Sequence, residues 1–131
     1  MKKIILITLL LSICFSQRNL FKSHPYATLG TNQDLTASAS SGDIDGDGDL
    51  DIIVANGRHW SQQNQIFYND GKGFFRRSRT LGSEQNTTYQ VPLADIDNDG
   101  DLDIIVGNDR IENQVFKMMV MGILRLIIIL V

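Results

Sequence analysis

Two stretches of alternating aspartates are the part of this sequence best suited to binding chemistry. They span residues 43–51 and 95–103 and hold ten of the fifteen acidic residues: Asp43, Asp45, Asp47, Asp49, Asp51, Asp95, Asp97, Asp99, Asp101 and Asp103. Five carboxylates within nine residues repel one another unless a cation lies among them. Two divalent ions would change the formal net charge from −3 to +1 (−3 + 4). The pattern therefore predicts two cation sites.

Calcium fits these loops best. It binds about six to eight oxygens at roughly 2.4 Å, and Gly48 and Gly100 permit the sharp turn that surrounds such an ion. In the first loop we expect side-chain ligands from Asp43, Asp45, Asp47 and Asp51 and a carbonyl ligand from Asp49. In the second we expect side-chain ligands from Asp95, Asp97, Asp99 and Asp103 and a carbonyl ligand from Asp101. The neighbouring apolar residues are expected to point away into the protein: Ile44, Leu50, Ile96 and Leu102.

Other interpretations of the loops fit less well. An EF-hand needs a Glu at the twelfth loop position followed by a helix, but that position is Val54 or Val106, inside β-type runs. Magnesium prefers to keep several waters in strict octahedral geometry. A plain acidic turn is the remaining alternative, and the recurrence of the same spacing favours metal binding over it.

The loops belong to an internal repeat of about fifty residues. The segment 42–54 recurs as 94–106, at an offset of 52 (94 − 42), and Thr28-Leu29-Gly30 returns at the same offset as Thr80-Leu81-Gly82. The segment 64–67 recurs as 113–116, at an offset of 49 (113 − 64). The difference indicates an insertion of three residues near 59–63 in the first unit.

Within each unit the apolar pattern is that of short strands. We expect strands at 37–41, 50–54 and 65–68, a further one beginning at Phe74 and Phe75, and their equivalents at 89–93 and 102–106. Four short strands in about fifty residues is the size of one propeller blade. The predicted fold is all-β, with two four-stranded β-propeller-type blades.

The motif Asp-x-Asp-x-Asp-Gly-x-x-Asp followed by an apolar strand resembles the FG-GAP, or VCBS-type, repeats of integrin α-chain propellers and of many secreted bacterial proteins. The resemblance covers Thr28 to Phe116. It implies a structural calcium ion in each loop, held by the aspartates assigned above. Propellers of this family usually have about seven blades, whereas this sequence shows two units, too few to close a propeller.

The start of the sequence suggests export. Residues 1–16 combine a charged start, an apolar run and small residues, which predicts a signal peptide and a secreted protein. Cys14 is a poor lipidation site, because the bulky Ile13 stands where a small residue is needed. A chain cleaved after Ser16 loses its single cysteine, so no disulfide can form. Residues 17–117 hold the two repeats, at about 28–79 and 80–117, the second incomplete.

Residues 118–131 form an aberrant apolar tail. Because Met has a single codon, a shift of one base at Lys117 would restore a turn like Asn69–Gly73, so we hypothesise a frameshift there. A membrane anchor is the literal alternative, but fourteen residues interrupted by Arg125 are too few for a true transmembrane span. A buried strand is the third.

The remaining residues suggest binding rather than catalysis. No nucleophile and base are paired by a recognisable motif, so no enzymatic activity is expected. His59 and Trp60, in the inserted loop, are candidate contacts for a glycan or protein partner, although packing of Trp60 on the sheet is the favoured alternative. The basic residues 76–79 suit a solvated strand edge better than nucleic acid.

We therefore expect a secreted adhesion or interaction scaffold with two structural calcium ions. The alternative is the non-catalytic repeat region of a longer extracellular enzyme acting on polysaccharide or another polymer.

Overall fold

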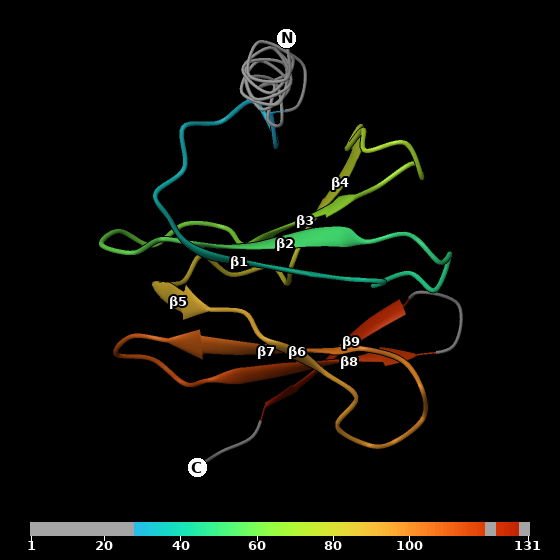
Figure 1. The fold of residues 1–131 in the computed structure, drawn as a ribbon. Helices are drawn as coiled ribbons and strands as arrows, with labels where there is room; N and C mark the ends of the chain where they lie inside the picture. Colours follow the sequence, from blue (N-terminus) through green and yellow to red (C-terminus); the bar gives the residue numbers. More distant parts are fainter. Residues whose placement is uncertain (1–27, 120–122, 129–131) are drawn as a thin grey trace, which may run out of the picture.

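The computed structural model of the chain describes residues 28–119 and 123–128. The predicted signal peptide, at 1–16, and part of the apolar tail lie outside these residues. The described residues form nine strands in two antiparallel sheets and contain no helix. The two sheets stack in layers, the first above the second in Figure 1. The all-β prediction is confirmed, and the two sheets are not closed into a ring.

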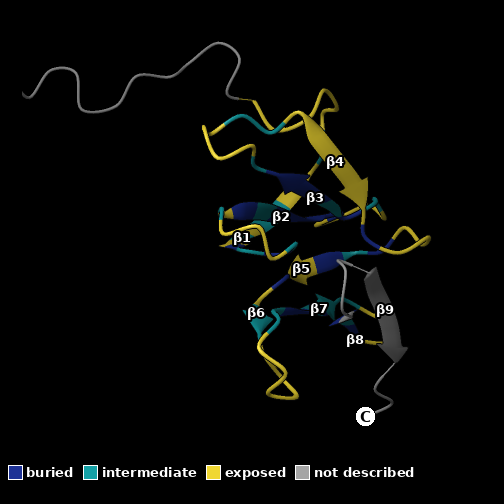
Figure 2. Ribbon diagram, turned by 90° about the vertical axis from the view of Figure 1, so that its right-hand side faces the viewer, coloured by how far each residue is buried: buried dark blue, intermediate teal, exposed yellow. Residues whose placement is uncertain are grey.

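The first sheet contains β1 (Thr36–Gly42), β2 (Asp51–Asn56), β3 (Gln65–Tyr68) and β4 (Arg77–Thr80), hydrogen-bonded in that order. The strand predicted to begin at Phe74 and Phe75 begins instead at Arg77. The reason is the preceding turn, in which the Asp70 carboxylate accepts the backbone N–H groups of Lys72 and Phe74 at 3.0 and 3.1 Å. This turn holds Phe74 outside the sheet, and β4 is exposed along its length (Figure 2).

The second sheet contains β5 (Thr88–Gln90), β6 (Leu93–Ala94), β7 (Asp103–Asn108), β8 (Gln114–Met119) and β9 (Ile123–Ile128). Its order is β5-β7-β8-β9, and β6 also pairs with β7. The single strand predicted at 89–93 is therefore wrong, because it is divided in two. Pro92 has no N–H to donate to a sheet, although its carbonyl accepts the N–H of Ile105 at 3.0 Å.

The described part of the apolar tail lies in this sheet. β8 continues through Met118, which is buried, and β9 pairs with β8 in an unbroken register from Gln114↔Ile128 to Met119↔Ile123. Of the three interpretations of the tail, the strand agrees with this backbone pairing. The frameshift hypothesis concerns the gene and stays a prediction.

The core lies between the two sheets. The first sheet contributes residues such as Ile53 and Ile66, and the second contributes Ile104, Val106 and Phe116. Gly42, at the end of β1, lies where a Cβ would be 2.7 Å from side-chain carbons of both Leu93 and Leu102. The absence of a side chain at this position lets the two sheets approach closely, and apolar burial across this layer drives their association.

The same polar cluster closes one end of each sheet. Thr36 donates its hydroxyl to the Asn56 side chain at 2.9 Å, and the Asn56 backbone N–H donates to the Asn64 side chain at 2.8 Å. In the second sheet Thr88, Asn108 and Asn113 make the same two bonds at 2.8 and 2.9 Å. The β1–β2 and β6–β7 loops, which hold the aspartates, lie at the other end (Figure 1).

Candidate metal centre

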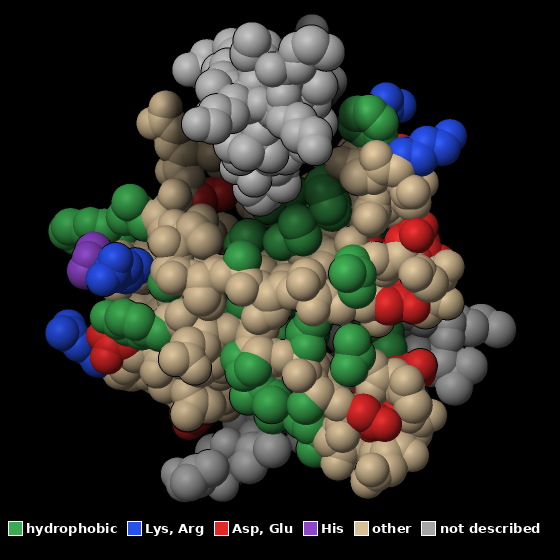
Figure 3. Space-filling view, in the orientation of Figure 1, with side chains coloured by type: hydrophobic (Ala, Val, Ile, Leu, Met, Phe, Trp, Pro, Cys, Tyr) green, Lys and Arg blue, Asp and Glu red, His purple; other side chains and the backbone are tan. Residues whose placement is uncertain are grey.

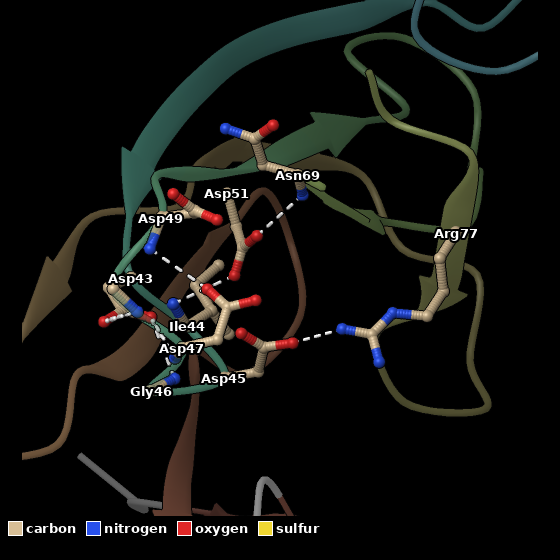
Figure 4. Close-up of polar contacts among 10 residues, drawn as sticks. Asp43, Ile44, Asp45, Gly46, Asp47, Asp49, Asp51, Asn69 and Arg77 are labelled. Carbon is tan, nitrogen blue, oxygen red and sulfur yellow. Dashed lines mark hydrogen bonds and ion pairs between the residues drawn. The ribbon is translucent and has the colours of Figure 1, made fainter. Parts of the chain in front are cut away.

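Asp43 organises the first acidic loop. Its carboxylate accepts the backbone N–H groups of Gly46, Asp47 and Gly48 at 2.8, 3.1 and 3.0 Å (Figure 4). Gly46 and Gly48 have φ angles of 76° and 92°, which favour glycine, so the chain can turn tightly around one side chain. The loop thus exists because its first aspartate binds its own backbone.

Asp51 ties the loop to the sheet. It is fully buried at the start of β2 and accepts the N–H of Ile44 at 3.1 Å and the N–H of Asn69, after β3, at 2.9 Å. Burial raises the pKa of Asp51, the two backbone hydrogen bonds oppose that rise, and the negative charges of Asp45 and Asp47 add to it. A cation at this position would favour the charged carboxylate.

Three carboxylates of this loop converge. Asp43, Asp45 and Asp51 each offer an oxygen within 4.8 Å of the others. One oxygen of Asp45, Oδ1, is buried and accepts no hydrogen bond from any described residue. The other, Oδ2, binds the guanidinium of Arg77, which also lies 4.1 Å from the centre of the Tyr68 ring. The loop therefore collects negative charge in one place and leaves a buried oxygen unpartnered.

The second loop repeats this pattern. Asp95 accepts the N–H groups of Asp99 and Gly100 at 3.2 and 3.1 Å, and the buried Asp103 accepts those of Ile96 and Met118 at 3.0 and 2.9 Å. The carboxylates that converge here are those of Asp95, Asp97 and Asp99. Lys117, on β8, pairs with Asp97 as Arg77 pairs with Asp45. Figure 3 shows acidic side chains of both loops at the same edge of the molecule.

These donors fit calcium. Both groups offer only oxygen, and the unpartnered oxygen of Asp45 is free to bind a cation. The two groups are not identical to the predicted ligand sets. Asp47 lies outside the first group, and its carboxylate accepts the N–H of Asp49 at 3.0 Å. Asp103 lies outside the second group. The carbonyl ligands predicted from Asp49 and Asp101 stay predictions.

The predictions for the flanking apolar residues were correct in part. Ile44 is buried and belongs to the core, and Leu102 packs against Gly42. Leu50 and Ile96, also expected to point into the protein, are instead 62% and 44% exposed. Trp60 does not pack on the sheet, because it is 72% exposed beside His59. The glycan or protein contact predicted for these two residues stays a prediction.

Sequence reasoning missed the residues that support the loops from other strands. Asn69, Arg77 and Lys117 contact aspartates that are 18 to 32 residues away along the chain. Asn69 carries a usable signal, since it follows a strand and opens a turn. For Arg77 and Lys117 the only signal is the excess of negative charge in each loop. That excess predicts a positively charged partner but does not indicate which basic side chain supplies it.

Comparison with known proteins agrees with the geometry. The family model described as an FG-GAP-like repeat matches residues 43–106, a span that includes both acidic loops. Residues 43–106 match an FG-GAP-like repeat. No curated protein and no solved structure matches it. Within the described residues there is no helix long and apolar enough to cross a membrane.

Proposed function

We propose that this FG-GAP-like chain is a secreted, calcium-stabilised scaffold for adhesion or interaction, with a binding rather than a catalytic role. The observation that supports it is the pair of acidic loops, folded by the same hydrogen bonds, in each of which three carboxylates converge. FG-GAP-like repeats suggest a repeat domain of the adhesion type. In this proposal the two sheets correspond to two blades of a propeller.

Calcium would be held in the first loop by Asp43, Asp45 and Asp51, and in the second by Asp95, Asp97 and Asp99. When bound, it would neutralise carboxylates that otherwise repel one another. Asp51 already bonds to both the loop and the residue after β3, so an ion there would hold three segments of the first sheet together. Binding to the folded state alone stabilises that state.

The test is thermal unfolding in EDTA and with increasing calcium. At a free calcium concentration a hundredfold above the dissociation constant, one site adds about 2.7 kcal/mol to the free energy of unfolding. We expect the melting temperature to rise with calcium, and the double variant Asp45→Asn/Asp97→Asn to lose most of that rise. Magnesium at the same concentration is the control. Identical melting curves in EDTA and in calcium would refute the proposed role.

The exposed Trp60 is the first place to look for a partner. An exposed aromatic ring can stack on a sugar or enter a protein pocket without any rearrangement of the fold. Replacement of Trp60 by Ala should leave the melting temperature unchanged, because the side chain is 72% exposed. If the loop binds glycan, the same variant should lose retention on a glycan array. Equal retention of both proteins would exclude Trp60 from binding.

A further inference from the structure

The two repeat units pack through unlike faces. We call residues 28–79 unit one and residues 80–119 unit two. The core side of unit one includes Ile53 and Ile66, whereas the core side of unit two includes Ile104 and Phe116. At the repeat offset of 52, Ile104 is equivalent to Ile52, the neighbour of Ile53 on the opposite side of its strand (104 − 52). The contact therefore joins the rear face of unit one to the front face of unit two.

Each face is defined by equivalent positions. The front face contains Leu29, Leu50, Ile52 and Phe67 in unit one and Leu81, Leu102, Ile104 and Phe116 in unit two. The rear face contains Ile44, Ile53, Ile66 and Asn64 in unit one and Ile96, Ile105, Val115 and Asn113 in unit two. Among residues 28–119 and 123–128, the internal contact leaves the front of unit one and the rear of unit two without a repeat unit against them.

Exposure differs between the units at two front-face positions, whereas Phe67 of unit one is buried like its equivalent Phe116. Leu81 is 4% exposed in unit two, but its equivalent Leu29 is 37% exposed. Leu102 packs against Gly42 of unit one, but its equivalent Leu50 is 62% exposed. The sequence thus keeps an apolar side chain at both of these positions in unit one, where water reaches it.

Two rear-face positions show the opposite difference, whereas Val115 of unit two is buried like its equivalent Ile66. Ile44 of unit one is 2% exposed, and its equivalent in unit two, Ile96, is 44% exposed. Asn64 is buried and donates its amide to the Thr88 hydroxyl of unit two at 2.8 Å. Its equivalent Asn113 is exposed, as is Thr36, the equivalent of Thr88. Both partners of a second copy of this bond are therefore present on the surface.

We propose that a second copy of this chain docks head to tail, with the front face of its unit one on the rear face of unit two of the first copy. The new contact would repeat the internal one, including an Asn113–Thr36 hydrogen bond in place of Asn64–Thr88. Both faces keep apolar side chains exposed to water, Leu29 and Leu50 on the front and Ile96 on the rear. Because the two surfaces differ, the contact is heterologous and builds a ring or an open chain of copies.

Sedimentation velocity of the full chain over a range of concentrations tests this. We expect the wild-type protein to associate, and the variants Leu29→Gln and Ile96→Gln each to associate roughly tenfold or more weakly, because each places a polar group in an apolar contact. Leu35→Gln and Ile111→Gln are matched controls, since these residues are 45% and 47% exposed but lie outside the two faces. Circular dichroism verifies that all four variants fold.

Mixing the variants gives the decisive result. Leu29→Gln keeps an intact rear face and Ile96→Gln keeps an intact front face, so a mixture should form a one-to-one dimer that cannot grow further. A wild-type protein that is monomeric up to its solubility limit would overturn the proposal. So would equal weakening by the control variants, or a mixture that associates no better than its components.

This inference names a partner for the proposed scaffold and so rests on it, but the two can fail separately. Calcium stabilisation is measured on the monomeric Leu29→Gln variant by its melting temperature. Association is measured on the wild-type protein by sedimentation in saturating calcium. A calcium-dependent melt without association would overturn only the docking proposal, and association without a calcium-dependent melt would overturn only the role of calcium.

Discussion

The replacement of Asp51 by Ala tests whether the buried aspartate stabilises the fold through hydrogen bonds as well as through any ion. The Asp51 carboxylate is fully buried and accepts two backbone N–H groups, from Ile44 and Asn69. Hydrogen bonds to a charged group contribute about 1.5 to 3 kcal/mol each. Loss of both should therefore lower the free energy of unfolding by about 3 to 6 kcal/mol, a large part of the stability of a small domain.

Charge must be separated from hydrogen bonding in this experiment. Removal of Asp51 also relieves repulsion among the carboxylates of the loop, which offsets part of the loss. Asp49→Ala is the matched control, because it removes the same charge from the same loop and Asp49 is partly exposed. In EDTA we expect Asp49→Ala to change the free energy of unfolding by less than about 1 kcal/mol.

Urea denaturation in EDTA measures the difference. With an m-value of about 1 to 3 kcal/mol/M, a loss of about 3 kcal/mol lowers the urea midpoint by about 1 to 3 M. Asp103→Ala should lower the urea midpoint less, because one of the two hydrogen bonds that Asp103 accepts comes from the N–H of Ile96, an exposed residue. If Asp51→Ala and Asp49→Ala had the same midpoint, the hydrogen-bonding role of Asp51 would be refuted.

Three further predictions concern residues outside the loops. Burial raises the pKa of Tyr68 above its ordinary value of 10.0. Its contribution to stability is therefore complete below pH 10 and declines as the pH rises toward the folded-state pKa. Tyr68→Phe should remove this decline in urea titrations at alkaline pH. Gly57→Ala should lower the free energy of unfolding by about 3 kcal/mol, because a Cβ at this position, where φ is 96°, would lie 2.2 Å from the Asn86 carbonyl oxygen. Gly46→Ala, where a Cβ would have no atom within 4 Å, should lower it by only about 1 kcal/mol. Equal shifts in melting temperature for the two variants would contradict this prediction. Asn64→Ala should lower the free energy of unfolding by about 2 to 4 kcal/mol, because it removes the buried hydrogen bonds to Asn56 and Thr88. If Asn113→Ala, at the exposed equivalent position, lowered it by more, the stabilising role of the buried cluster would be contradicted.

The repeat pattern predicted much of the fold, because each strand carries its own local signal. Gln65–Tyr68 was predicted with its observed bounds, and the strands after each acidic loop were placed to within two residues. Errors arose where one side chain competes with the sheet. Asp70 closes a turn that keeps Phe74 out of β4, and Pro92 divides the strand before the second loop.

For the candidate site, the sequence predicted which aspartates belong together but not how they are supported. Spacing within a loop is a local property, so the convergence of Asp43, Asp45 and Asp51 could be anticipated. The exposure of Leu50 and Ile96 could not, because it depends on which face of each unit is covered by the other. Equivalent positions in a repeat share a chemical type but differ in their neighbours.

The polar cluster at the end of each sheet has a consequence for loop length. Asn56 and Asn64 are eight residues apart, whereas their counterparts Asn108 and Asn113 are five apart, yet both pairs make the same hydrogen bond at 2.8 and 2.9 Å. The bond fastens the two strands at the base of the loop, so the residues between its ends can change in number without disturbing the register. The connection after β2 is therefore a position where new sequence can be inserted, and a different binding specificity acquired, on an unchanged framework.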